Sequence, residues 1–380
     1  MLQNIVERVQ NNKLFIEAHI ADLHFGAFNP EEQYKILKEQ FLAVIQGMGI
    51  LDIVSINGDI FDHKFMANSD AVMYACYFID DLVQICAQKN ATLLIVGGTF
   101  KHDADQLKLF YKYVQSYQGV DVRIVEEVRF EYVKGKKILI IPELYGKGKE
   151  YYSKYLFDSG IYDAVYMHGA LERCIYGLDK EDLDSVREPV FSMDDFINCA
   201  GPIISGHVHT PGCHGVYFYY CGCPYRWEFG QEEEKGFIIL LHNTVTREHA
   251  VHFQPIKSFR YDTINLDDMI EGDPQVIIEY IDKLQKNGID HIRIQLTKNS
   301  EDNLSVLKTF YRTNSNVKID VNFKNEEVVK NIKKLDEKYK NYEYLKSASE
   351  PECKLVQYMD QCEGSAFITV DELKEILRNI

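Results

Sequence analysis

Five short apolar runs, each followed by aspartate or histidine, constrain the fold of this chain more than any other feature. The central run, Ile53-Val-Ser-Ile-Asn, is broken by Gly58, so Asp59, Asp62 and His63 follow the end of a buried strand. The other four runs lead to these residues: Asp22 and His24; His102 and Asp103; His168; His207 and His209. Because open α/β sheets bind ligands at the carboxyl ends of their strands, we expect all five ends to form one site.

The residue types at these strand ends predict a metal centre. Imidazole and carboxylate ligands together favour borderline divalent ions such as manganese, iron or zinc over ions that prefer oxygen alone. Two ions roughly 3.5–4 Å apart need a bridging carboxylate, and Asp59 at the central strand end is the natural bridge. Taken alone, any one of these histidines would be read as a structural residue rather than a metal ligand. Five ligand-bearing strand ends in one chain favour a site.

Composition limits the class of protein and its compartment. The chain has 380 residues, of which 46% are apolar, enough for roughly two or three domains with buried cores. Its net charge of −16 argues against binding nucleic acid by overall charge. Nine scattered cysteines suit a reducing compartment. The polar N-terminus is unlike a signal, and no run approaches the roughly 18 apolar residues of a membrane span. We therefore expect a cytoplasmic protein that does not span a membrane.

The order of expected elements indicates an α/β fold with two packed sheets flanked by helices. In the first half, strands alternate with helices over 31–48 and about 70–88, as in parallel βαβ units. Shorter strand-like runs follow at 129–133, 136–141, 163–168, 202–206, 216–221, 236–241 and 248–254. We expect these strands to complete the two sheets.

A boundary near 255–260 precedes a smaller α+β domain. Its expected elements are a strand over 259–264, a helix from Asp273-Pro274 to Gly288, a strand over 291–296, a helix near 301–311 and a strand over 317–323. The charged remainder ends in two amphipathic helical segments, which suit docking on a partner helix or folding back on the small domain. The expected regions are 1–257, 258–325 and 326–380.

The ordered ligand motifs resemble those of the calcineurin-like metallophosphoesterases. They are Asp22-x-His24, Gly58-Asp59-x-x-Asp62, His102-Asp103, His168 and Gly206-His207-x-His209. The segment 220–237 looks like the one that follows the last metal histidines in SbcD nucleases, and 258–323 looks like their capping domain. The resemblance covers about 1–325. It implies a homodimeric, manganese-dependent DNA exonuclease or endonuclease that acts with a coiled-coil ATPase of the SbcC type in double-strand-break processing and recombination.

The same resemblance implies a role for each motif residue. The first metal would be held by Asp22, His24, Asp59 and His209, and the second by Asp59, His168 and His207. Next to them, His102, with Asp103, would be catalytic: it would stabilise charge on the phosphoryl oxygens or protonate the leaving group.

One departure from the family pattern concerns the second metal. The family motif reads Gly-Asn-His-Asp or Gly-Asn-His-Glu, with the asparagine as a ligand, whereas this chain has Gly98-Thr-Phe-Lys101-His102. A charged lysine offers no lone pair, so we expect the second metal to be weakly held or differently ligated. Alternatively, Lys101 contacts phosphate directly.

The remaining candidate residues have structural alternatives. Asp62 and His63 either tune the first metal or form an exposed loop pair, and His63 could face DNA. Arg226 and Trp227 could contact the DNA backbone and a base or sugar, although the single tryptophan is equally suited to a core.

Two other functions stay open at this level. A phosphatase or nucleotide phosphodiesterase of the same superfamily would use the same ligands but would need no residues like 258–380. A catalytically weak scaffold subunit would explain Lys101 but not the intact remaining ligands.

Overall fold

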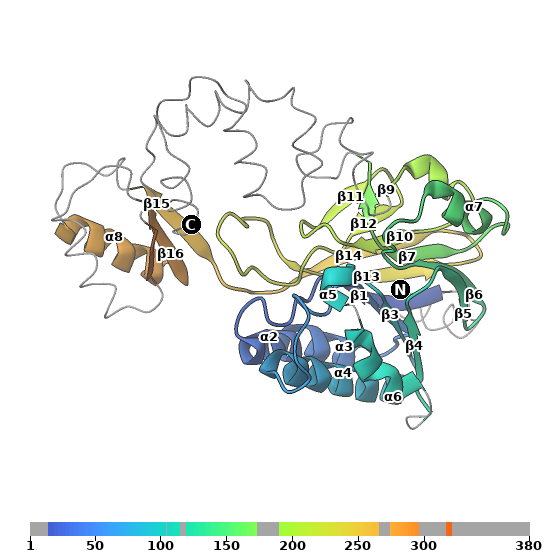
Figure 1. Ribbon diagram of the computed structural model, residues 1–380, viewed down its shortest axis with the longest axis horizontal. Helices are drawn as coiled ribbons and strands as arrows, with labels where there is room; N and C mark the ends of the chain where they lie inside the picture. The colour runs from blue at the N-terminus through green and yellow to red at the C-terminus, as the bar shows by residue number, and fades with distance from the viewer. Residues whose placement is uncertain are drawn as a thin grey trace, which may run out of the picture.

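Two six-stranded sheets packed face to face form the body of the protein (Figure 1). This computed structural model describes residues 14–103, 105–114, 119–172, 190–265, 274–295 and 317–320. In spatial order the first sheet consists of β14 (His249–Pro255), β13 (Gly236–Asn243), β1 (Leu14–Ile20), β2 (Ile53–Asn57), β3 (Thr92–Val96) and β4 (Asp121–Val125). The second consists of β11 (Gly212–His214), β12 (Phe218–Tyr220), β10 (Ile203–Gly206), β7 (Ala164–His168), β6 (Lys136–Ile141) and β5 (Arg129–Val133). The expected α/β class with two packed sheets is confirmed.

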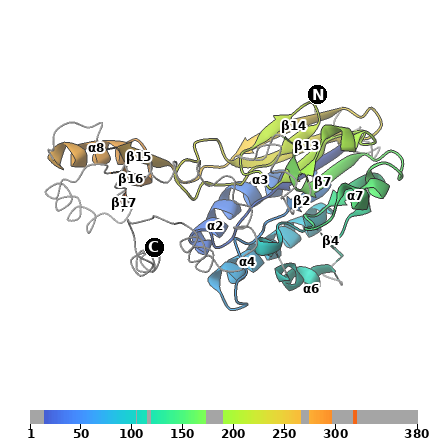
Figure 2. The same cartoon turned by 45° about the horizontal axis from the view of Figure 1, so that its top comes forward.

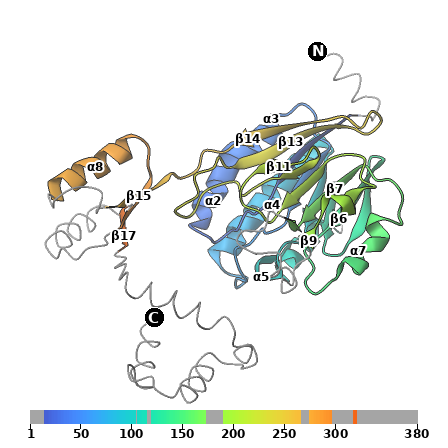
Figure 3. The same ribbon diagram turned by 90° about the horizontal axis from the view of Figure 1, so that it is seen from above.

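Helices cover the outer face of each sheet (Figures 2 and 3). On the first sheet these are α2 (Pro30–Leu37), its π-helical continuation η1 (Lys38–Leu42), α3 (Ala43–Gly47) and α4 (Asp70–Lys89). The second sheet packs against α7 (Lys149–Leu156). Side chains of β2 point alternately to the two faces of the first sheet. Val54 and Ile56 pack against the helices, while Ile53 packs against the second sheet.

The long helix α4 begins and ends as its sequence predicts. The Ser69 side chain accepts a hydrogen bond from the Val72 backbone N–H at 3.3 Å, which caps the first turn. Asn90 ends the helix in the left-handed conformation with a φ of 51°. Its buried face, which includes Phe78 and Leu82, packs into the core under the first sheet.

Strand pairing within the first sheet was only partly predictable. Strands β1 to β4 pair in parallel, as βαβ units require, but β4 was not expected from the sequence. Strands β13 and β14 return to this sheet, with Leu14 opposite Asn243 in the antiparallel pair of β1 and β13. Hydrophobic alternation identifies a strand but does not say which sheet it joins.

A three-stranded parallel sheet with one described helix follows β14 and lies at the left of Figure 1. Its elements are β15 (Tyr261–Asn265), α8 (Pro274–Lys286), β16 (His291–Gln295) and β17 (Val317–Asp320). The Arg293 guanidinium lies 4.1 Å from the ring centroid of Phe229, which links this sheet to the segment before β13. The helix expected near 301–311 and the region 326–380 lie outside the described residues. Within the described ranges, no helix is both long and apolar enough to cross a membrane.

A buried polar network lies between the two large sheets. The Lys136 ammonium donates to the Glu17 carboxylate and, at 2.9 Å, to the Tyr166 hydroxyl, which itself donates to Glu17. His19 approaches the same carboxylate at 3.1 Å, and all four residues are fully buried. Burial alone would raise the pKa of Glu17, but the Lys136 ammonium, His19 and His242 together outweigh burial and hold the pKa well below its usual range.

Lys136→Met should therefore destabilise the protein by about 3–5 kcal/mol, because it leaves the Glu17 charge buried without a partner. Urea denaturation measures the change in the free energy of unfolding. The matched control is Lys38→Met, because Lys38 forms an exposed pair with Asp81 at 3.0 Å. It should cost no more than about 1 kcal/mol. Equal effects of the two substitutions would contradict the role assigned to the buried pair.

Candidate metal centre

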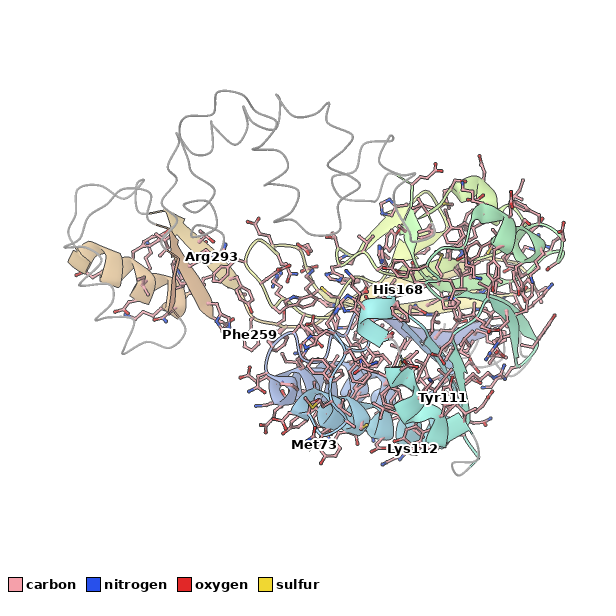
Figure 4. All side chains as sticks on the ribbon, in the orientation of Figure 1. Met73, Tyr111, Lys112, His168, Phe259 and Arg293 are labelled. Carbon is pink, nitrogen blue, oxygen red and sulfur yellow. The ribbon has the colours of Figure 1, made fainter. Side chains whose placement is uncertain are left out.

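Six strand ends from the two sheets meet at one edge of the sandwich. Each contributes side chains to a single cluster: β1 contributes Asp22 and His24, β2 Asp59, β3 Thr99, β6 Glu143, β7 His168, and β10 His207 and His209. Figure 4 shows His168 close to α5 (Phe100–Asp103), the short helix that follows β3. The six metal ligands expected from the sequence are thus brought together.

One group of possible ligands consists of Asp22, His24 and His209. Their ligand atoms lie within 4.8 Å of one another. The Nε2 atoms of His24 and His209 are 3.1 Å apart, and His24 Nε2 lies 3.8 Å from Asp59 Oδ2. Together with Asp59, this is the set expected to hold the first metal.

A second group consists of Glu143, His168 and His207. Glu143 Oε2 lies 3.4 Å from His168 Nε2 and 3.1 Å from His207 Nδ1. Asp59 Oδ2 lies 3.3 Å from His168 Nε2, so the same carboxylate oxygen borders both groups. That position suits the bridging role expected of Asp59.

Glu143 and Thr99 complete the second group, and the sequence motifs did not reveal either. The Thr99 hydroxyl donates to Asp59 Oδ2 at 3.1 Å and lies 3.2 Å from Glu143 Oε2. Lys101 is exposed on α5 and outside the cluster, whereas the Thr99 hydroxyl lies in it, which suits the expected alternative that the second metal is differently ligated. A carboxylate two residues after the end of the apolar β6 was the available signal for Glu143.

The backbone at the cluster is held in an uncommon conformation. Asp22, His24, Asp59 and His207 have φ values of 52°, 43°, 54° and 84°, in the left-handed region that non-glycine residues rarely adopt. Gly58, with a φ of 87°, allows close packing, because a Cβ there would lie 2.1 Å from His168 Nδ1. Such strain persists where surrounding contacts enforce it and is concentrated at functional sites.

Asp103 positions the loop after β2 instead of facing the cluster. Its carboxylate accepts hydrogen bonds from the backbone N–H groups of Asp59 at 2.9 Å, Ile60 at 2.9 Å and Gly98 at 3.0 Å. These bonds occupy both oxygens of a buried side chain. The geometry therefore favours a positioning role for Asp103 over the catalytic role expected from the sequence.

His102 belongs to the cluster, with a ring nitrogen within 4.8 Å of ligand atoms of His24 and Asp59, and its other nitrogen is restrained. Nδ1 bonds the carbonyl oxygen of Asp62, so Nδ1 is the donor and Nε2 faces Asp59 Oδ2 at 4.0 Å. One oxygen of the Asp62 carboxylate lies 3.6 Å from Nδ1 of His24. Its other oxygen bonds Nδ1 of the exposed His63 at 2.9 Å.

Arg226 and Trp227 have different surroundings, although they are adjacent in sequence. Arg226 Nη2 donates to the carbonyl oxygens of Glu232 and Glu233 at 3.1 and 2.6 Å. The guanidinium therefore points to the backbone of the loop that follows it rather than to an exposed DNA-facing position. The partly buried Trp227 ring lies 5.3 Å from His24 and 5.2 Å from His209, between ring centroids. The single tryptophan is therefore a direct neighbour of the first group.

The cluster is electrostatically suited to cations. Burial alone would lower the pKa of His168, but Asp59 and the other carboxylates raise it well above its ordinary value. For His24 burial dominates and lowers the pKa to about 3, which leaves the ring neutral with a free lone pair near neutral pH. The carboxylates therefore attract positive charge while His24 stays able to bind a metal.

The side chains present fit divalent metal ions. Among the described residues, the buried atoms Asp22 Oδ2 and Glu143 Oε1 have no hydrogen-bond partner. The His168 Nδ1 atom bonds the Asn57 carbonyl oxygen at 2.8 Å, so its Nε2 faces Asp59 and Glu143. Metal-binding histidines are commonly held in this way through their other nitrogen. Imidazole with carboxylate favours manganese, iron or zinc.

Comparisons with known proteins leave the family of this chain unassigned. No family model and no curated protein matches the sequence. A solved crystal structure is similar with a TM-score of 0.39 and 12% sequence identity, over 63% of this chain and 99% of that chain. A likeness this low carries no argument about function.

Glu143→Gln should remove one bound manganese ion and leave the other in place. Calorimetric titration should show two ions for the unaltered protein and one for the variant, because Glu143 belongs only to the second group. Manganese should quench Trp227 fluorescence equally in both proteins, because the ring contacts only first-group ligands. The control is Glu248→Gln, on the exposed segment before β14. Loss of quenching in Glu143→Gln would contradict the two-group assignment.

Proposed function

We propose that this chain is a two-metal phosphodiesterase that hydrolyses DNA, with the architecture of the calcineurin-like metallophosphoesterases and of SbcD nucleases in particular. One observation carries the proposal: Asp59 Oδ2 lies 3.8 Å from His24 Nε2 and 3.3 Å from His168 Nε2, between two groups of possible ligands. Two-metal phosphoesterases need a shared carboxylate in that position.

The chain's own residues divide the work of the reaction. Two divalent ions, manganese by resemblance, would neutralise phosphoryl oxygens and activate water for in-line attack. Asp22, His24 and His209 would hold the first ion, Glu143, His168 and His207 the second, with Asp59 between them. His102 would direct Nε2 to the departing 3′-oxygen, because Nδ1–H donates to the Asp62 carbonyl oxygen, and in its imidazolium form it would give that oxygen the Nε2 proton.

The acidity of the chain bears on how it would engage DNA. With a net charge of −16, the protein lacks the overall positive surface that supports non-specific DNA binding. We include in the proposal an SbcC-type coiled-coil ATPase that contributes this surface, a homodimeric nuclease and a cytoplasmic location. Region 326–380 is the proposed docking arm.

Asp59→Asn and His207→Ala should each lower manganese-dependent DNA hydrolysis by at least about a hundredfold, since each weakens the electrostatic stabilisation of the transition state. Both variants should keep a cooperative thermal melt, because these residues lie at strand ends. The control is His252→Ala, on the exposed side of β14, which should retain activity. The assay measures release of nucleotides from labelled linear duplex and single-stranded DNA.

The outcome separates the proposed function from its alternatives. Retained activity in Asp59→Asn would contradict the site. Hydrolysis of phosphate monoesters or nucleotides without DNA hydrolysis would favour the phosphatase or nucleotide phosphodiesterase. Binding of two ions with no hydrolysis of any phosphoester would favour the scaffold subunit.

A further inference from the structure

We propose that Phe100 and Lys101 form a subsite for the nucleotide next to the scissile phosphate. The Phe100 ring stacks on the base, and the Lys101 ammonium pairs with the backbone phosphate. The inference rests on the proposed DNA phosphodiesterase function and specifies its substrate: a strand whose terminal bases are unpaired or frayed.

Phe100 presents an exposed aromatic ring close to the metal cluster. Its side chain is 69% exposed, the highest value for a phenylalanine or tyrosine in the described part of the chain. An exposed phenylalanine forgoes the stabilisation that burial would provide. An aromatic ring that is open to solvent beside a reaction centre is therefore available to a ligand.

The position of Phe100 along the chain places it next to the chemistry. The residue before it, Thr99, donates to Asp59 at 3.1 Å, and His102 follows two residues later with Nε2 4.0 Å from the same oxygen. Two residues span at most about 7 Å between Cα atoms. The ring is therefore within reach of a nucleotide bound at the cluster.

The surroundings of α5 suit a nucleic-acid strand. Gln106 Nε2 donates to the carbonyl oxygens of His63 and His102 at 3.0 and 2.7 Å, which joins the loop after β2 to α5. Along this joined rim, Lys64 and Met66 are 70% and 80% exposed. Exposed cations beside apolar and aromatic side chains are the pattern of single-strand binding surfaces.

Lys101 is the cation on this rim that is open to a phosphate. Lys64 lies 3.9 Å from Asp105, whose carboxylate also bonds Lys108. In the described part of the chain, Lys101 has no ion pair or hydrogen bond of its side chain, and it is exposed. The Lys101 ammonium can therefore pair with phosphate without first breaking a contact.

Stacking on Phe100 favours unpaired bases over paired ones. A base inside a duplex is already stacked on both faces, so a protein ring gains little from it. A frayed or single-stranded base has a free face, and stacking on an aromatic side chain is tolerant of sequence. This device would let an acidic protein select strand ends without broad electrostatic attraction.

The test compares the manganese-dependent hydrolysis of two DNA strands by Phe100→Ala and Phe100→Trp. One is a single-stranded oligodeoxynucleotide, and the other carries abasic residues beside the cleaved bond. Phe100→Ala should lower kcat/KM on the normal strand about tenfold, and Phe100→Trp should restore it. On the abasic strand, Phe100→Ala should change kcat/KM by no more than about twofold. Lys101→Met should lower kcat/KM on both strands.

A binding measurement decides the inference independently of catalysis. In EDTA, a strand containing 2-aminopurine should lose fluorescence on binding the unaltered protein but not on binding Phe100→Ala. The control is Phe157→Ala, a 45% exposed ring at the end of α7, which should behave like the unaltered protein.

The subsite would be overturned if Phe100→Ala lowered kcat/KM equally on both strands, or if it left kcat/KM on the normal strand unchanged. If the unaltered protein cleaves neither strand, the proposed function fails, and the fluorescence measurement still decides whether Phe100 binds a base.

Discussion

The attraction between buried carboxylates and cations governs the arrangement of this protein. Asp22, Asp59 and Glu143 are buried within one cluster, and so many carboxylates are costly to bury unless positive charge compensates them. Imidazoles supply part of that charge, as the raised pKa of His168 shows. Divalent ions would supply the rest, and the unpartnered oxygens of Asp22 and Glu143 are the atoms that would receive them.

The scaffold fixes this cluster through the same strands that carry it. Glu17 lies on β1, which leads to Asp22, and its buried partner Lys136 lies on β6, which leads to Glu143. Tyr166, the third member of the network, lies on β7 two residues before His168. The polar network between the sheets therefore sets the relative position of the two ligand groups. A shift of one sheet against the other would break the network and move Asp22 and His24 away from His209.

The sequence predicted the strand ends but not every side chain that they deliver. Apolar runs followed by aspartate or histidine located the aspartate and histidine ligands, because parallel strands bring their carboxyl ends to one edge. Glu143 was missed because a single carboxylate after a strand has no distinctive spacing. The departure at Lys101 indicated a differently ligated second metal but did not identify Thr99, because the chain enters α5 directly after Thr99 and turns the next residues away from the cluster. The contacts of Asp103 and Arg226 with the backbone depend on tertiary structure that no local pattern reveals.

Anomalous diffraction from crystals soaked in manganese tests the central claim most directly. We expect two manganese peaks about 3.5–4 Å apart. One should be bound by Asp22, His24 and His209 and the other by Glu143, His168 and His207, with Asp59 touching both. A single peak, or peaks that Asp59 does not bridge, would contradict the two-metal centre.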